Sequence, residues 1–294
     1  MSKKIFNNNS NIPCTIAINS IYPSLRNSEK QVADYILQHP EDVLTHPLRG
    51  LSVQIGVSEA SVIRFCKSIG CSGYSELKLK IAREQGDTTR AEEPQTGLDV
   101  FCNTEIAEIP DIIIAQSIRT LEDTLKIFDH VPYEQAIRKL RSADRVILFG
   151  VGNSASVAND AMHKFMRIGL LCHVYEDAHM QLMASSNLSE KDVVIGISHS
   201  GMTRDTIDAM AAARDAGAFT ICITNYGASP ITGVSDICLL TASGETTFDS
   251  ETMASRIAQL AIIDMLYIGL ILQDYHGYRE KIDHANAVLK GKSY

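Results

Sequence analysis

The sequence predicts an all-α helix-turn-helix domain followed by an α/β domain with a doubly wound, five-stranded parallel sheet. Two patterns along the chain predict this. Up to residue 87, short helical stretches alternate with Gly and Pro stops, whereas after residue 142 short apolar runs alternate with helical stretches. Strands that alternate with helices are typical of a parallel sheet covered on both faces. A length of 294 residues suits two compact units.

The front of the chain is expected to consist of a tail and several short helices. Residues 1–20 are rich in Asn and Ser and show no period, so we expect a flexible tail. Apolar residues at helical spacing predict a helix over 27–37, which His39-Pro40 ends. Further helices are predicted over 48–56, after Ser58 and over 74–84. We therefore expect a small helical domain over 21–86.

A helix-turn-helix signature lies in the middle of this domain. Gly56 can end one helix in the left-handed conformation, and Ser58 can cap the next, which Gly70 ends. Val62 and Phe65 mark the buried face of this second helix, and basic and hydroxyl residues mark the other. Major-groove reading requires such a helix pair. The candidate DNA-contacting residues are Ser58, Ser61, Arg64, Lys67 and Lys78.

The charge distribution favours DNA contact at the front only. The net charge is −8, but residues 1–87 hold ten Lys/Arg against eight Asp/Glu, which leaves the rest of the chain strongly acidic. Residues 49–83 carry a net charge of +4. An acidic body repels nucleic acid, so binding should be confined to the helical domain. The alternative is a plain helical bundle with a solvated charged face, because short motifs match by chance.

A domain linker is predicted between the two units. From Gln85 to Gly97 the chain has no aliphatic residue but Ala91 and no period, so we place the linker at 87–98 and the second domain at 99–294. Helices are expected over 112–128 and 132–141. The predicted strands are 145–149, 171–175, 193–197, 219–224 and 237–240. Helices are expected to start near 154, 178, 203 and 230, with closing helices over 254–272 and 275–289. Five runs favour a flavodoxin-like strand order.

Two hydroxyl-bearing loops follow predicted strands and open helices. One spans 149–156 and the other 197–203. Both lie at carboxyl ends of strands, where such sheets bind ligands, and helix N-termini there attract anions. Two such loops on neighbouring strands predict a phosphate site. The hydroxyl donors are Ser154, Ser198, Ser200 and Thr203. The alternative is that these residues only cap helices, although one helix end needs only one cap.

Other functions are weighed against a phosphate sensor. Gly150-x-Gly152-x-x-Ala155 also fits a dinucleotide fingerprint, with Glu176 as the acidic partner, but this leaves the second loop unexplained. A sugar isomerase would need a general base, for which His179, His199 and Glu251 are available without a marked pair. The His/Glu/Asp cluster over 173–179 lacks clean metal-ligand spacing. We expect no cofactor, no metal and no catalysis.

Two further features concern the compartment and the closing helix. The seven cysteines contain no Cys-x-x-Cys pair, which indicates buried thiols in a reducing compartment. We find no apolar signal core and no span of about 20 apolar residues, so we expect a cytoplasmic protein without membrane contact. Arg256 opens the apolar helix, where we expect a structural salt bridge, with ligand contact as the alternative.

The two halves together resemble the RpiR family of bacterial transcriptional regulators. The resemblance covers 24–272: the stretch 56–67 with Gly70, Gly73-Tyr74 and 75–78 in front, then Gly150-x-Gly152-x-Ser154, Ser198-x-Ser200-Gly201-x-Thr203 and 255–260 in a SIS (sugar isomerase) domain. Gly50 departs from the usual polar residue before the turn.

This resemblance implies a partner, an effector and an assembly. It implies a winged or simple helix-turn-helix that binds operator DNA as a homodimer or homotetramer. It also implies a SIS domain that senses a sugar phosphate, with Ser154, Ser198, Ser200 and Thr203 on the phosphate and Asn153 and His199 flanking it. The expected function is a DNA-binding regulator of carbohydrate metabolism whose operator affinity depends on that effector.

Overall fold

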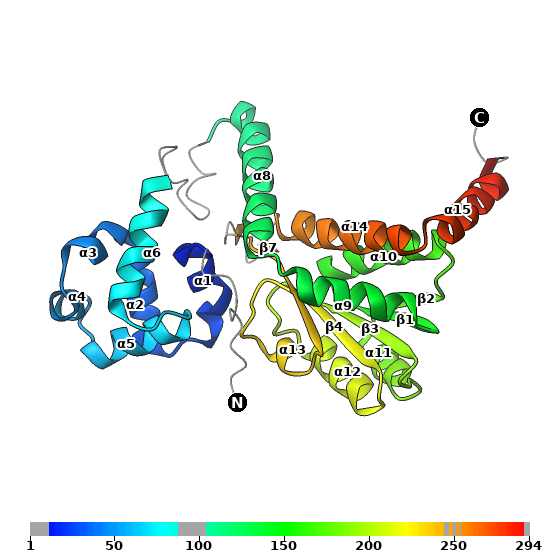
Figure 1. Cartoon of the computed structure of the whole chain (residues 1–294), viewed down its shortest axis with the longest axis horizontal. Helices are drawn as coiled ribbons and strands as arrows, with labels where there is room; N and C mark the ends of the chain where they lie inside the picture. The colour runs from blue at the N-terminus through cyan, green and yellow to red at the C-terminus, as the bar shows by residue number, and fades with distance from the viewer. Residues whose placement is uncertain (1–11, 88–103, 244–246, 249–250, 253, 291–294) are drawn as a thin grey trace.

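The computed structural model describes residues 12–87, 104–243, 247–248, 251–252 and 254–290. A helical domain and an α/β domain follow one another along the chain, and α8 (Ile109–Ile127) stands between them (Figure 1). The predicted linker lies outside the described residues, except for Asp87, with which α6 ends.

The described residues of the helical domain form six α-helices whose inward positions are apolar. Their bounds are α1 (Cys14–Ile21), α2 (Asn27–Gln38), α3 (Pro40–Thr45), α4 (Leu48–Ile55), α5 (Glu59–Ser68) and α6 (Tyr74–Asp87), with a 3-10 turn, η1 (Tyr22–Ser24), after α1. Val62, Phe65 and Leu77 are fully buried where α5 and α6 meet the rest of the domain. The helices predicted here are confirmed, with α6 three residues longer than expected.

The expectation of a flexible tail through residue 20 is wrong. Residues from Cys14 onward form α1, which packs on α6, and Ile18 is fully buried. The Asn- and Ser-rich composition concealed this helix because its apolar residues, Ile16, Ala17 and Ile21 among them, are buried on nearly all sides and therefore give no amphipathic period. Residues 1–11 of the expected tail lie outside the described part of the chain.

The α/β domain is built on a parallel sheet with the predicted strands. The strands are β1 (Arg145–Phe149), β2 (Cys172–Tyr175), β3 (Asp192–Ile197), β4 (Phe219–Thr224) and β5 (Ile237–Leu240). Their order is β2-β1-β3-β4-β5, which confirms the flavodoxin-like arrangement. Phe149 is in register with Gly196, so the loops after β1 and β3 leave the sheet side by side.

Helices cover both faces of this sheet (Figure 1). The bounds are α9 (His130–Arg141), α10 (Asn153–Arg167), α11 (Ala178–Ser185), α12 (Arg204–Asp215), α13 (Pro230–Gly233), α14 (Ser255–Gln273) and α15 (Tyr275–Leu289). One apolar cluster joins α9, α10 and α14 to one face, and another joins α11 and α12 to the other. Outside these layers, β6 (Thr247–Phe248) and β7 (Glu251–Thr252) pair antiparallel, and η2 (Ile106–Glu108) precedes α8.

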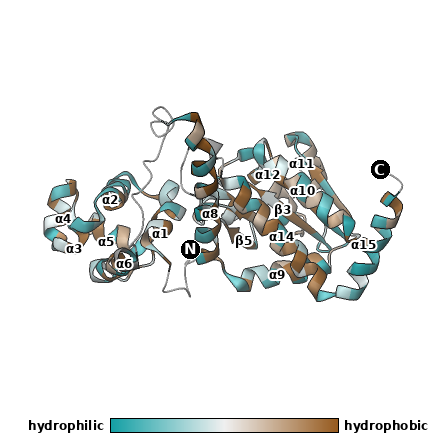
Figure 2. Cartoon of the chain, turned by 90° about the horizontal axis from the view of Figure 1, so that it is seen from above, coloured by the Kyte–Doolittle hydropathy of each residue, from teal (hydrophilic) through white to brown (hydrophobic). Residues whose placement is uncertain are grey.

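The closing helix α14 is a core helix. It contacts α8, α9 and α10, and Ile262, Ile263 and Leu266 are fully buried. Its length and its mean hydropathy of 1.6 would also suit a membrane span. That is weak evidence, because the core helix of a soluble domain has the same composition. Apolar residues are dense on α14 and α8 (Figure 2).

The two domains share one apolar cluster. The core of the helical domain includes Ile127, the last residue of α8. Ala228, Leu240 and Ala242, from the loop after β4 and the end of β5, pack against the same cluster. The helical domain is therefore seated on the edge of the α/β domain where the parallel strands end.

Candidate functional site

The turn between α4 and α5 has the geometry of a helix-turn-helix. Gly56 has a φ of +79°, and its N–H donates to the carbonyls of Ser52 and Val53 at 3.1 and 3.2 Å. Ser58 precedes α5, and its Oγ accepts the backbone N–H of Ser61 at 3.2 Å. Each of these features satisfies backbone groups that a helix end otherwise leaves unpaired. The cap at Ser58 is therefore in place as the sequence indicates.

The structure places most of the candidate DNA-contacting residues at the surface. Ser58, Arg64 and Lys67 are exposed on or just before α5. Lys78 is half-buried, and its Nζ lies 5.6 Å from the centre of the Tyr74 ring. These side chains come from the turn before α5, from α5 and from α6.

Ser61 does not share that exposure. Its side chain is buried, and its Oγ lies 2.9 Å from Ser58 Oγ and accepts a hydrogen bond from Arg64 Nη2 at 2.9 Å. The expectation that Ser61 faces outward is wrong, because its hydroxyl is turned toward the helix start. Arg64 is held from a second side, since its Nε lies 4.0 Å from Oε1 of the buried Glu29.

The two hydroxyl-bearing loops lie next to each other. The loop after β1 opens α10, the loop after β3 opens α12, and the two strands are paired in parallel. This is the point at which strand order reverses, because β2 lies on one side of β1 and β3 on the other. Such switch points are where open α/β sheets bind ligands.

Glycine is required in both loops. A Cβ on Gly150 would lie 2.8 Å from the backbone oxygen of Ser154, so a side chain there would push α10 away from the strand. Gly201 has a φ of +63°, and a Cβ there would lie 2.1 Å from Ser229 Oγ. The glycines therefore allow close packing and a left-handed turn, which other residues adopt at a cost.

The hydroxyls in these loops do not act as helix caps. The N-cap positions of α10 and α12 are Gly152 and Thr203, and neither makes a side-chain capping hydrogen bond. Ser198 Oγ is 3.0 Å from Thr203 Oγ1 and accepts Gly201 N–H at 3.1 Å, and Ser200 Oγ accepts Met202 N–H at 3.2 Å. No side chain therefore caps the first-turn N–H groups of α12, where an anion could bind. At α10 the N–H groups of Ser154 and Ala155 donate to the carbonyls of Val151 and Gly152 at 3.2 and 3.0 Å.

The remaining candidates flank these loops. Ser154 is half-buried in the first turn of α10, and Asn153 is exposed at its start. The His199 ring lies edge-on to Tyr226, with 5.7 Å between ring centres. The structure therefore brings all six phosphate-site candidates to the same edge of the sheet.

Asn225 was missed by the sequence analysis and connects several segments. It is buried directly after β4, and its backbone N–H donates to the His199 carbonyl at 3.0 Å. Its Oδ1 accepts the Ser243 N–H at 2.7 Å. The N–H of Ala242, one residue earlier, donates to Thr124 Oγ1 of α8 at 3.0 Å. The signal in the sequence that could have identified Asn225 is a polar residue directly after a predicted strand.

Gln181 was also missed and supports the first loop from below. It lies on α11 with no exposure, and its Nε2 donates to the Tyr175 carbonyl at 2.9 Å and to the Gly150 carbonyl at 3.5 Å. No described residue provides a partner for its Oε1. No pattern in the sequence marks Gln181, because it has no ionisable group and its burial follows from the fold.

Glu176 and Asp177, which were considered for a dinucleotide site or a metal site, make structural hydrogen bonds. Glu176 accepts a hydrogen bond from Asn159 Nδ2 at 2.6 Å, and Asp177 caps α11 by accepting Met180 N–H at 3.0 Å. The strand order also differs from that of the dinucleotide-binding fold. Glu251, a candidate base, lies in β7, where side chains are outside the described set.

The described cysteine thiols are buried or, at Cys238, half-buried, as the sequence predicts. Burial raises the pKa of the Cys14 and Cys66 thiols to about 12, so both stay protonated and unreactive at neutral pH.

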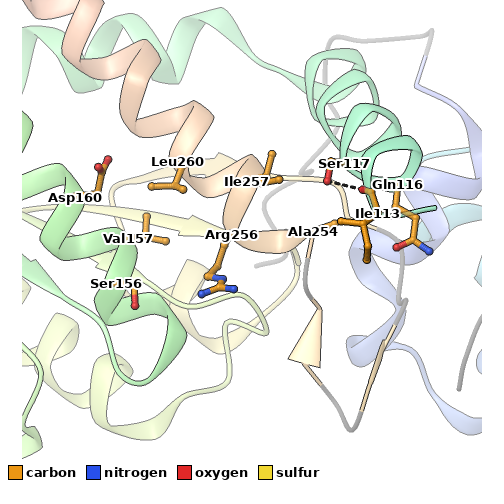
Figure 3. A pocket seen from close by; sticks show the side chains of 10 residues that line it. All are labelled: Ile113, Gln116, Ser117, Ser156, Val157, Asp160, Ala254, Arg256, Ile257 and Leu260. Carbon is orange, nitrogen blue, oxygen red and sulfur yellow. Dashed lines mark hydrogen bonds between the residues drawn. The ribbon is translucent and has the colours of Figure 1, made fainter. Parts of the chain in front are cut away.

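The expected salt bridge of Arg256 does not form with any described carboxylate within 4.0 Å. That expectation is wrong, and the side chain instead lines a cavity between α8, α10 and α14 (Figure 3).

Comparisons with known proteins agree with both domains. Residues 14–87 match the helix-turn-helix domain of the rpiR family, and residues 139–269 match the SIS domain. An uncharacterised HTH-type transcriptional regulator of Caldanaerobacter subterraneus is 36% identical over 274 residues, which are 92% of this chain and 95% of that protein. The chain belongs to the rpiR family of helix-turn-helix transcriptional regulators.

Two further relatives frame this rpiR-family regulator. The structure of the Vibrio vulnificus NanR protein complexed with ManNAc-6P has a TM-score of 0.61 and 25% identity, covering 95% of this chain and 99% of that chain. The bifunctional protein glk of Burkholderia mallei is 34% identical over 256 residues, 87% of this chain, although the match spans 39% of that longer protein. The regulator thus matches NanR across both of its domains.

Proposed function

We propose that this protein controls genes of carbohydrate metabolism by binding operator DNA through α5, with an affinity that changes when a sugar phosphate binds between the loops after β1 and β3. One observation carries this proposal. The two hydroxyl-bearing loops lie side by side at the switch point of the sheet, and the helices that they open lack side-chain caps. Hydroxyls and free helix N–H groups are suited to a phosphate.

The DNA contact is assigned to the exposed side chains around α5. Ser58, Arg64 and Lys67 would contact base edges and phosphates, and Lys78 would contact the backbone. Ser61 has a different role, since its buried hydroxyl holds the Arg64 guanidinium at 2.9 Å. Two modes of contact with operator DNA are therefore open to Arg64. Either its guanidinium leaves Ser61 and Glu29 when DNA binds, or it contacts DNA while it keeps these two partners.

The effector contact is assigned to Ser154, Ser198, Ser200 and Thr203, flanked by Asn153 and His199. The structure of the relative NanR is that of a complex with ManNAc-6P, which supports a sugar phosphate as the class of ligand. Because the loop after β3 is bonded to Asn225, and the loop after β4 packs on the shared apolar cluster, a change at the effector loop would reach the DNA-binding domain. By linkage, operator DNA would change effector affinity by the same factor.

We propose that the regulator acts as a homodimer through α8. Ile114, Ile118, Leu121 and Leu125 are exposed and spaced four, three and four residues apart, which is the spacing of a coiled-coil seam. Two helix-turn-helix units are needed to read two half-sites, so the occupant of this seam is α8 of a second copy. Ile118→Asp should give monomers in light scattering, whereas Arg119→Asp, beside the seam, should leave the dimer intact.

We propose a sensor rather than an enzyme, acting in the cytoplasm on DNA. His199 and His179 are the described candidate bases, and a DNA-binding domain adds nothing to isomerisation. A coupled assay with sugar phosphates distinguishes the two functions: a thermal shift without turnover supports the sensor, and turnover supports an isomerase.

The deciding experiment is a gel-shift titration with and without sugar phosphates. The variant Ser198→Ala/Ser200→Ala should bind operator DNA like the wild type and lose the effector response. Ser142→Ala is the matched control, because Ser142 is exposed at the end of α9, at the opposite edge of the sheet. A full effector response in the double variant would overturn the phosphate assignment.

A further inference from the structure

We propose that Glu29 and Ser61 are positioning residues for operator recognition, and that Arg64 contacts DNA while these two residues hold its guanidinium. This role rests on the proposed function, since it concerns the same helix-turn-helix, and it selects one of the two modes of contact that are open to Arg64. It goes beyond that function, because it gives the DNA-binding domain two residues that set sequence specificity without contacting DNA.

Arg64 is held from two helices. Its Nη2 donates to Oγ of Ser61, one turn earlier on α5, at 2.9 Å. Its Nε lies 4.0 Å from Oε1 of Glu29, in the first turn of α2, and α2 packs against α5. A guanidinium is planar and rigid, so contacts on two of its edges fix its orientation. The Arg64 fork is therefore oriented before DNA binds.

Each partner of Arg64 is itself fixed. Ser61 is buried, and its Oγ lies 2.9 Å from Ser58 Oγ, which also accepts the Ser61 backbone N–H at 3.2 Å. Glu29 is buried as well, and its Oε2 accepts the backbone N–H of Arg26 at 3.0 Å. One carboxylate oxygen thus caps α2 while the other faces Arg64. Moving either partner would break a contact at the start of a helix.

The burial of Glu29 favours the mode in which Arg64 stays in place. The side chain of Glu29 is 8% exposed, and no other described cation lies within 4.0 Å of its carboxylate. Release of Arg64 would therefore leave a buried carboxylate without a cation, which is costly. DNA that contacts Arg64 where it is held avoids this cost.

The held guanidinium still has donors to offer to DNA. The Arg64 side chain is 48% exposed. A guanidinium has five N–H groups, of which Ser61 accepts one, and no described residue accepts from Nη1. The outer edge of the fork can therefore contact two acceptors on a guanine. Ser61 and Glu29 are buried and do not reach a base themselves.

Orienting Arg64 in advance should act on specificity. An arginine loses rotamer freedom when it contacts a base, and such a loss weakens binding about 2- to 10-fold per immobilised side chain. With Glu29 and Ser61 in place, this loss occurs on folding. The gain applies to base contacts, because phosphate contacts carry no sequence information. Glu29 and Ser61 should therefore raise the preference for the operator and not the general affinity for DNA.

The test measures binding of the full-length protein to two DNA probes. One probe is a duplex that the wild type selects from a random-sequence pool, and the other is a duplex of shuffled sequence. Glu29→Gln removes the negative charge but keeps an oxygen for the Arg26 N–H, so α2 remains capped. In anisotropy titrations this variant should lower the ratio of the two affinities about 2- to 10-fold without weakening binding to the shuffled duplex. A merely structural role would weaken binding to both probes.

Further variants connect the effect to Arg64. Selection with Glu29→Gln should relax the same base position that Arg64→Ala relaxes. In the Arg64→Ala background, Glu29→Gln should change the affinity ratio no further, because the residue that it positions is gone. Ser61→Ala keeps its backbone N–H on Ser58 and should lower the ratio as Glu29→Gln does. Glu41→Gln, which changes an exposed acid of α3, is the matched control and should leave the ratio unchanged.

Each outcome decides the inference. An unchanged affinity ratio in folded Glu29→Gln, an equal loss of affinity for both probes, or additive effects of Glu29→Gln and Arg64→Ala would overturn it. Tighter binding of the selected duplex by Glu29→Gln would also overturn it, since Glu29 would then withhold Arg64 from DNA. If Glu29→Gln fails to fold, the same criteria apply to Ser61→Ala.

The proposed function stands in all these cases, provided that Arg64→Ala loses the preference for the selected duplex. A wild-type affinity ratio in Arg64→Ala, or a wild type that selects no sequence, would count against α5 as the operator contact and against the inference together.

Discussion

The backbone N–H of Asn225 donates to the carbonyl of His199 over 3.0 Å, which joins the loop after β4 to the loop after β3. Thr224 Oγ1 donates to the same carbonyl at 3.1 Å. The proposed effector loop is thus bonded twice to the segment whose Ala228 packs against the core of the DNA-binding domain. These two bonds and this packing connect the proposed effector loop to the DNA-binding domain.

Replacing Asn225 by Ala should uncouple effector binding from operator affinity. The variant loses the bonds between Asn225 Oδ1 and Ser243, but it keeps every hydroxyl of the phosphate loops. We expect sugar-phosphate binding to persist in thermal shift, while the effector-dependent change in gel shift falls. Asn286→Ala, on the exposed face of α15, is the matched control. An unchanged response in Asn225→Ala would show that the side-chain bonds of Asn225 to Ser243 do not carry the signal, since the backbone bond to His199 survives this substitution.

Replacing Gly201 by Ala should destabilise the sensor domain and remove effector binding. The residue has a φ of +63°, and the new Cβ would lie 2.1 Å from Ser229 Oγ, so the loop must shift. The strained backbone alone costs about 1–3 kcal/mol. Thermal unfolding and calorimetry measure the two effects. Gly233→Ala is the control, because a Cβ there would meet no described atom within 4 Å and its φ is not positive. Equal behaviour of the two variants would contradict the packing argument.

Arg64→Ala and Lys67→Ala should weaken operator binding in different ways. If Arg64 reads a guanine, its loss should cost about 1–3 kcal/mol and relax specificity at one position. If Lys67 contacts a phosphate, its loss should weaken all sequences alike and reduce the salt dependence by about one ion. Anisotropy titrations at several salt concentrations separate these effects. Arg138→Ala, in the α/β domain, should leave both quantities unchanged. Wild-type affinity in Arg64→Ala would remove α5 from the interface.

Asp192→Asn should destabilise the α/β domain in a pH-dependent manner. Asp192 is buried and accepts two hydrogen bonds of 2.7 Å from Arg145, and these bonds hold the pKa of its carboxyl below the usual value. A depressed pKa contributes stability above the unfolded-state pKa of about 3.9, and that stability is lost as pH falls through the folded-state pKa. Because Arg145 is partly exposed and can be rehydrated, loss of the charged pair should cost about 1.5–3 kcal/mol at pH 7.

Urea unfolding at neutral and acidic pH tests this prediction. The difference in unfolding free energy between wild type and Asp192→Asn should be largest at pH 7 and shrink below about pH 4. Asp283→Asn removes an exposed pair with Arg279 and should leave the free energy of unfolding nearly unchanged. A gap that stays constant down to low pH would mean that packing, not charge, explains the loss.

The sequence predicts the architecture well because each element has its own periodic signal. The strands are buried apolar runs, and the helices that follow them start at Gly- and Ser-rich turns, so the sheet and the two phosphate loops are found where expected. The proximity of the loop after β1 to the loop after β3 follows from the pairing of these two strands. The alternation of strands and helices therefore locates the candidate site.

What the sequence cannot reveal depends on tertiary contacts. Helical spacing places Ser61 on the outer face of α5, but its hydroxyl turns toward Ser58 and Arg64, which no periodicity records. Arg256 has acids near it in sequence, yet the fold gives it no described partner. The role of Asn225 arises from three segments that are distant along the chain and meet only in the folded protein.

The apolar cluster that includes Ile127, Ala228, Leu240 and Ala242 makes the melting of the two domains interdependent. Separating the two domains would expose the apolar side chains that they now bury against each other. An isolated α/β domain should therefore aggregate more readily than the intact chain. In calorimetric scans the intact protein should melt in a single cooperative peak. An effector bound at the loops after β1 and β3 would then raise the melting temperature of both domains together.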